Sequence, residues 1–100
     1  MDIFEVIKND VSSHPIVLYM KGDKAQPMCR FSMDVVKVLN EYEVEYETRD
    51  VLADETLREA IKVFSDWPTL PQLYVNGEFV GGRDIVMEMH MGGELKSMLE

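Results

Sequence analysis

The apolar run IVLYM at residues 16–20 constrains the fold of this 100-residue chain most. Five consecutive apolar residues, rich in β-branched and aromatic side chains, predict a strand that is buried on both faces. Apolar residues at helical spacing predict one helix over residues 2–12, before His14-Pro15, and another over residues 29–42. Residues 21–27, with their glycine and proline, predict a loop between the strand and the second helix.

The second half of the chain predicts a β-hairpin between helices. Residues 45–51 alternate as a strand, and residues 54–65 have apolar side chains at helical spacing. Residues 72–81 contain Asn76-Gly77 between two short apolar runs, which is the strongest local signal for a hairpin. Asp84 is placed as the N-cap of further helical turns before and after Gly92-Gly93. The chain therefore reads as a βαβ unit followed by a ββα unit.

Composition and charge exclude several classes of protein. No repeat or linker divides the chain, so we expect one domain over residues 1–100. No apolar run approaches the ~20 residues that a membrane span needs, and the acidic N-terminus predicts no secretory signal or transit peptide. A net charge of −9 without a basic block argues against nucleic-acid binding. A single cysteine favours a reducing compartment, the cytoplasm.

Cys29, the only cysteine, lies at the predicted start of a helix. The positive end of the helix dipole and the nearby cations Lys21, Lys24 and Arg30 would favour its thiolate. The alternative is that Cys29 is a small buried apolar residue. Because no second cysteine exists, any chemistry at this sulfur requires an outside thiol or a metal.

Three motifs in the chain have a specific spacing. Lys21-Gly22 followed by Pro27-x-Cys29-x-Phe31-Ser32 resembles the signature Lys-Gly…Pro-x-Cys-Gly-Phe-Ser of the monothiol glutaredoxins, a family of the thioredoxin fold. The segment WPTLPQ at residues 67–72 and Gly81-Gly82-x-Asp84-Ile85 resemble two further hallmark segments. The resemblance covers nearly the whole chain and implies an α/β, thioredoxin-like fold, with a central four-stranded mixed sheet and about five helices.

The resemblance also implies glutathione as a ligand. Cys29 would be the sole nucleophile and the sole metal-binding thiol, and ten residues would bind glutathione: Lys21, Phe31, Arg58, Lys62, Thr69, Leu70, Pro71, Gly82, Arg83 and Asp84. Arg30 replaces the usual glycine, and Arg83 stands where this branch often has a second cysteine. The long cation at position 30 puts the geometry of a bound cluster in question.

Each part of glutathione has a chemical counterpart among these residues. Lys21 and, one turn apart on a helix, Arg58 and Lys62 would face the glycine carboxylate, although a solvated helix surface is the commoner role for such a pair. The proline of a Thr69-Leu70-Pro71 turn, cis in the family, would leave the backbone of Leu70 free to pair with the tripeptide. The amides of Arg83 and Asp84 would bind the γ-glutamyl carboxylate, and the Asp84 carboxylate its ammonium.

The single thiol leaves three functions open. Ser32 replaces a resolving cysteine, so a mixed disulfide on Cys29 would need a second glutathione. A 2Fe-2S cluster takes four thiolates, which two chains and two glutathiones supply. We therefore expect a cluster-bridged homodimer, monomeric when apo, that transfers clusters to iron-sulfur acceptor proteins, with a BolA-like protein as a further partner. The alternatives are a glutathione-dependent thiol-disulfide oxidoreductase, which Arg30 would favour, and an adaptor without redox chemistry.

Overall fold

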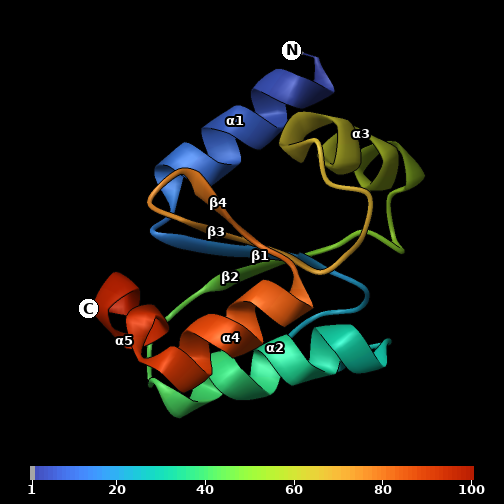
Figure 1. Ribbon diagram of the computed structural model, residues 1–100. Coiled ribbons are helices and arrows are strands. Elements are labelled where there is room, and N and C mark those ends of the chain that lie inside the picture. The colour runs from blue at the N-terminus through green and yellow to red at the C-terminus, as the bar shows by residue number, and fades with distance from the viewer. Residues whose placement is uncertain (1) are drawn as a thin grey trace.

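Helices and strands alternate along residues 2–100, the part of the chain that the computed structural model describes (Figure 1). In chain order the elements are α1 (Ile3–Ser13), β1 (Ile16–Met20), α2 (Arg30–Glu41), β2 (Glu47–Asp50), α3 (Glu55–Ser65), β3 (Gln72–Val75), β4 (Glu78–Gly81), α4 (Arg83–Gly92) and α5 (Glu94–Leu99). The order confirms the predicted βαβ and ββα units. None of these helices has the length and apolar character that crossing a membrane requires.

The sheet is mixed and has the strand order β2-β1-β3-β4. Strand β1 pairs with β2 in parallel and with β3 in antiparallel orientation, and β4 pairs with β3 as a hairpin. Asn76 and Gly77 both have positive φ, 52° and 82°, as the predicted tight turn requires. The four-stranded mixed sheet of the thioredoxin-like fold is therefore confirmed.

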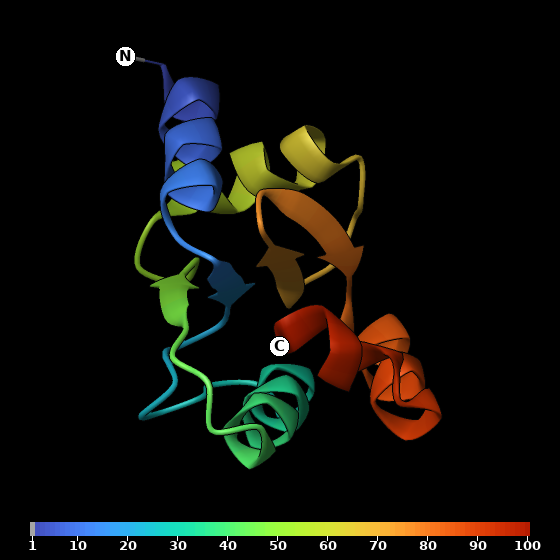
Figure 2. The ribbon, with the colours of Figure 1, turned by 90° about the vertical axis from the view of Figure 1, so that its left-hand side faces the viewer.

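Helices cover both faces of the sheet. Helices α1 and α3 pack on one face, and α2, α4 and α5 pack on the other (Figures 1 and 2). Strand β1 is fully buried because its side chains alternate between the two layers. Leu18 and Met20 join the core under α2 and α4, whereas Val17 and Tyr19 join the core under α1 and α3. The apolar run thus forms the strand that the sequence predicted, buried on both faces.

The start of α4 corrects one expectation. The N-cap is Gly82, whose carbonyl accepts a hydrogen bond from the N–H of Val86 at 3.0 Å, and helix α4 begins at Arg83. Asp84 lies in the first turn, so its assignment as the N-cap was wrong. The extended backbone of Gly82 starts the helix without a side-chain cap, and the left-handed Gly93 separates α4 from α5.

Candidate functional site

The loop after β1 brings Cys29 to the N-terminus of α2. Cys29 is the N-cap, half-buried, with extended backbone (φ −155°, ψ 143°). Gly22 makes the loop turn tightly at φ +87°, and a Cβ there would lie 2.4 Å from the carbonyl oxygen of Gln26. An isolated bridge between Gly22 and Pro27 closes the loop. The motif residues therefore hold the thiol at the start of the helix, as predicted.

The surroundings of Cys29 favour its thiolate. Partial burial alone would raise the pKa of Cys29. The pKa nevertheless lies below its ordinary value, because the thiolate is stabilised by the backbone N–H groups of Ser32 and Phe31, by the Ser32 hydroxyl and by the charge of Lys21. Ser32 is fully buried, and its oxygen accepts a hydrogen bond from the N–H of Lys21 at 3.1 Å. Its hydroxyl proton remains available to a thiolate at Cys29.

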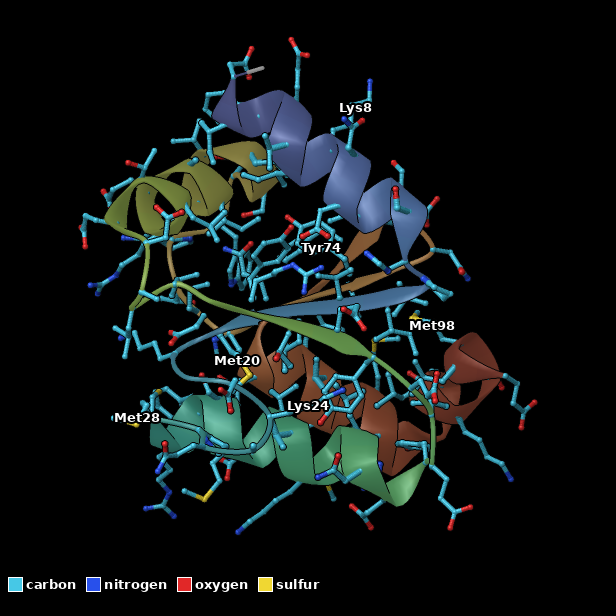
Figure 3. The ribbon with its side chains drawn as sticks, turned by 180° about the vertical axis from the view of Figure 1, so that it is seen from behind. Lys8, Met20, Lys24, Met28, Tyr74 and Met98 are labelled. Carbon is cyan, nitrogen blue, oxygen red and sulfur yellow. The ribbon has the colours of Figure 1, made fainter. Side chains whose placement is uncertain are left out.

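One of the cations expected near Cys29, Lys24, lies elsewhere. The Lys24 amino group donates to the Tyr46 carbonyl oxygen at 2.6 Å and lies 4.8 Å from the centre of its ring, so the expectation that Lys24 acts on the thiol was wrong. Figure 3 shows Lys24 over the middle of the helical layer, away from the end where Met28 lies. Arg30 follows Cys29 directly but lines a second groove, which also contains Cys29 and does not contain Lys21.

Removing the Ser32 hydroxyl tests its part in this effect. We expect Ser32→Ala to raise the pKa of Cys29, because a stabilising hydrogen-bond donor to the thiolate is lost. The pH profile of alkylation by iodoacetamide should move to higher pH, so that the rate falls at pH values below the new pKa. Ser12→Ala, an exposed serine on α1, is the control. A profile that Ser32→Ala leaves unmoved would contradict the role of the hydroxyl.

A groove of about 430 Å³ lies beside Cys29 and gathers residues from five parts of the chain. Nine of the ten predicted ligand-binding residues line it together with Cys29: Lys21, Phe31, Arg58, Lys62, Thr69, Leu70, Gly82, Arg83 and Asp84. Pro71 is buried and does not line the groove. Trp67, Pro68 and Ile85 also line it, and sequence reasoning assigned them no ligand contact. Their membership in the hallmark segments was the signal that could have identified them.

One end of the groove is cationic. Lys21, Arg58 and Lys62 line it from the loop after β1 and from α3. The amino group of Lys62 lies 3.0 Å from a carboxylate oxygen of Glu59, whereas the Nε of Arg58 is buried and has no hydrogen-bond partner. A buried donor without a partner costs about 1–3 kcal/mol. An anionic ligand at this end would supply the acceptor that Arg58 lacks.

The Thr69-Leu70-Pro71 turn forms one wall. The peptide bond between Leu70 and Pro71 is cis, as the resemblance implied. The side-chain amide of Gln72, which is fully buried, donates to the carbonyl oxygens of Thr69 and Trp67, both at 3.1 Å. Within residues 2–100 the backbone N–H and C=O of Leu70 make no hydrogen bond. They are therefore available to an extended peptide.

The N-terminus of α4 forms the other end of the groove. The amides of Arg83 and Asp84 belong to the first turn, where N–H groups have no partner within the helix. The Arg83 guanidinium donates to carboxylate oxygens of Asp34 and Asp84, each at 3.0 Å, and lies 5.9 Å from the centre of the Phe31 ring. Arg83 thus links α2 to α4 beside the groove, a contact that sequence reasoning missed. Neither Asp34 nor this pairing belongs to any recognised motif.

A thioredoxin-like fold with a single cysteine at the start of a helix, next to a groove with a cationic end, defines a monothiol member of the thioredoxin superfamily. The glutaredoxin family model matches residues 16–80. The chain belongs to the glutaredoxin family, and within it to the monothiol glutaredoxins.

Relatives and solved structures support this assignment. The chain is 52% identical to a monothiol glutaredoxin of Synechocystis over 90% of this chain and 84% of the relative. It is also 52% identical to a probable monothiol glutaredoxin of Rickettsia conorii over 97% of this chain and 91% of the relative. Reduced poplar apo GrxS14 has a TM-score of 0.82 at 44% identity, covering 93% of this chain and 85% of its own. A buckwheat glutaredoxin-glutathione complex has a TM-score of 0.86 at 25% identity, covering 97% and 86%.

Proposed function

We propose that this protein binds glutathione in the groove beside Cys29 and, as a pair of chains, carries a 2Fe-2S cluster to iron-sulfur acceptor proteins. The observation that carries the proposal is a single thiol, with a lowered pKa, that opens onto a groove with cations at one end and a helix N-terminus at the other. Glutathione has carboxylates at both ends and a thiol between them. The groove offers a counterpart to each.

The contacts of glutathione follow from this match. Lys21 and Arg58 bind the glycine carboxylate, and the amides at the start of α4 bind the γ-glutamyl carboxylate. The free backbone of Leu70 pairs with the cysteinyl residue as an added strand would. This geometry directs the glutathione sulfur toward Cys29. The structural similarity to the buckwheat glutaredoxin-glutathione complex supports the same ligand.

The number of thiols determines the stoichiometry of the cargo. A 2Fe-2S cluster needs four ligands, and this chain has one cysteine. Two copies of Cys29 and two glutathione thiols complete the set, so the carrier is a homodimer and the apo protein a monomer. Because glutathione is exchangeable, its release frees coordination positions for the thiols of an acceptor protein.

A second function, removal of glutathione from proteins, is favoured by the lowered pKa of Cys29. The Cys29 thiolate would attack the glutathione sulfur of a protein mixed disulfide, and the protein thiolate would leave with the electron pair and take up a proton. A second glutathione thiolate would then attack the Cys29-bound glutathione, which yields glutathione disulfide and restores Cys29. Ser32 cannot perform this second step because it has no sulfur.

Reconstitution under anaerobic conditions separates the two functions. We expect iron, sulfide and glutathione together to give a coloured protein, and the same mixture without glutathione to give none. A colourless protein that still forms a mixed disulfide with glutathione would support the oxidoreductase in place of the carrier. Arg30→Gly, measured in parallel, reports whether the cation beside Cys29 changes cluster occupancy.

The ion pair of Lys62 provides a finer test of the cationic end. Glu59 is 65% exposed at its side chain, and such a surface pair contributes about 0.2–0.5 kcal/mol. We expect Glu59→Gln to release Lys62 and to tighten glutathione binding about twofold, as measured by NMR titration. Glu88→Gln, an exposed acid on α4, is the control for the change in net charge. Unchanged or weaker binding in Glu59→Gln would mean that Lys62 does not face the ligand.

We propose that residues 1–100 form one glutaredoxin domain and that a BolA-like protein can replace the second subunit. We also propose that the protein acts in the cytoplasm, or in the mitochondrial matrix of a eukaryote. Relatives include a mitochondrial monothiol glutaredoxin of Arabidopsis thaliana and a chloroplastic one of Oryza sativa. The mitochondrial relative supports the mitochondrial matrix as the alternative compartment.

A further inference from the structure

A second groove adjoins Cys29 and shares only this residue with the first. It is open, has a volume of about 600 Å³ and runs along the face of α2 that carries Arg30, Met33 and Lys37. The proposed function gives this groove no role. Because glutathione would occupy the first groove, a partner's thiol must reach the Cys29 sulfur from another direction, and the second groove provides one.

The rim of the second groove is cationic. Arg30 and Lys37 are exposed, and neither side chain makes an ion pair or hydrogen bond within residues 2–100. The one acid that lines the groove, Asp34, is paired with Arg83 at 3.0 Å. Two unpaired cations beside a neutralised acid give this groove a positive charge on a chain whose net charge is −9.

The wall of the second groove is apolar and adaptable. Met28 is 62% exposed and Met33 is 37% exposed, and both line the groove. Figure 3 shows Met28 at the N-terminal end of α2 with its side chain pointing away from the body of the protein. Methionine side chains are flexible and polarisable, so they pack against apolar side chains of varied shape. Such a surface suits a polypeptide rather than one fixed small molecule.

The spacing of the two cations also suits a peptide. Arg30 and Lys37 are two helical turns apart, which is about 10 Å along the axis at 1.5 Å per residue. Side chains on one face of an extended peptide lie two or four residues apart, which is about 7 or 13 Å at ~3.3 Å per residue, and the long side chains of Arg30 and Lys37 cover the difference. An extended segment with acidic residues at either interval would therefore meet both cations.

We infer that the second groove docks the segment of a partner polypeptide that carries the partner's reactive cysteine, with acidic residues near that cysteine and an apolar residue against the methionines. This inference deepens the proposed function, because either proposed reaction brings a partner thiol to Cys29. Arg30 and Lys37 then determine which partners react. They are specificity residues and do not touch glutathione.

The net charge and the local charge of the second groove predict opposite preferences for peptides. A chain of charge −9 should attract basic peptides and repel acidic ones. At ~0.1 M salt, however, charges more than about 10 Å away are largely screened. The local cations Arg30 and Lys37 therefore outweigh the distant acids, and acidic peptides should react faster.

Stoichiometric exchange with peptide disulfides tests the inference without free glutathione or iron. Two short cysteine peptides, one with glutamates and one with lysines around an apolar residue, are prepared as mixed disulfides with 2-thiopyridine. The Cys29 thiolate attacks the peptide sulfur, a Cys29–peptide disulfide forms, and the thiopyridine leaves with the electron pair and is protonated to a measurable thiopyridone. The acidic-to-basic ratio of rates within each variant cancels any change in thiolate fraction.

We expect the native protein to react with the acidic peptide about five to ten times faster than with the basic one at low salt. The ratio should fall to one or below in Arg30→Gln/Lys37→Gln and should fall in 0.5 M salt. Lys8→Gln/Lys96→Gln, which removes two exposed cations outside both grooves, should keep the ratio; Figure 3 shows Lys8 on α1, across the sheet from α2.

Three results would overturn the inference. The first is a native protein that reacts faster with the basic peptide. The second is an acidic preference that survives in Arg30→Gln/Lys37→Gln. The third is a loss of rate in Arg30→Gln/Lys37→Gln that is as large with the 2-thiopyridine disulfide of glutathione as with the acidic peptide, which would make the groove a second glutathione site. None of these three results depends on cluster binding. A colourless reconstituted protein would therefore contradict the carrier function and leave the peptide preference of the second groove unaffected.

Discussion

Cys29→Ser yields a folded protein that forms no mixed disulfide with glutathione and holds no 2Fe-2S cluster. Both activities require a sulfur at this position, and the chain has no other. Serine is a favourable N-cap, and the sulfur of Cys29 makes no capping hydrogen bond, so α2 should keep its stability or gain up to about 1 kcal/mol. Mass spectrometry of the glutathionylated protein and visible absorption after reconstitution measure the two losses.

The control for this variant moves the thiol. Cys29→Ser/Ser12→Cys retains one cysteine per chain but places it on α1, on the opposite face of the sheet from α2. We expect it to remain without a glutathione-dependent cluster, because the new thiol lies outside the groove. A stoichiometric cluster in Cys29→Ser, or its rescue by Ser12→Cys, would refute the assignment of Cys29 as the ligand.

Arg58→Met separates ligand binding from stability. The Nε of Arg58 is buried without a partner in the free protein, so an unbranched apolar side chain at this position removes an unsatisfied donor. We expect the free energy of unfolding without glutathione to stay the same or to rise by up to about 1 kcal/mol. Glutathione should bind about 10- to 100-fold more weakly, because a charge-assisted hydrogen bond contributes about 1.5–3 kcal/mol.

NMR titration with glutathione and thermal unfolding with and without it measure both effects. Lys8→Met removes a cation of α1 that lies outside the groove and is the matched control. Binding to Arg58→Met that stays within twofold of the native affinity would show that Arg58 does not contact the glycine carboxylate. A large loss of stability without glutathione would show instead that Arg58 supports the fold.

The backbone of the site could be predicted because it depends on local sequence. The run at residues 16–20, the hairpin at Asn76-Gly77 and the helix start at Cys29 each carry a signal within a few residues. The resemblance to monothiol glutaredoxins pointed to ten residues as ligand-binding, and nine of them line one groove. A family motif indicates which distant side chains share one site, whereas composition and periodicity indicate only the local secondary structure.

The side-chain partners could not be predicted because they depend on the packing of distant elements. Lys24 is close to Cys29 in sequence, yet the loop directs it to Tyr46. Arg83 pairs with Asp34 across 49 positions of sequence separation. Asp84 has the composition of an N-cap, but the helix begins one residue before it, after Gly82. In each case several partners are compatible with the sequence, and the tertiary structure selects one.

Native mass spectrometry of the anaerobically reconstituted protein tests the central claim most directly, because it counts the components of a single complex. The account predicts one species that contains two chains, two glutathiones and one 2Fe-2S cluster, and that is absent when glutathione is omitted. A cluster held by the two chains without glutathione, or a monomer that carries glutathione alone after full reconstitution, would contradict it.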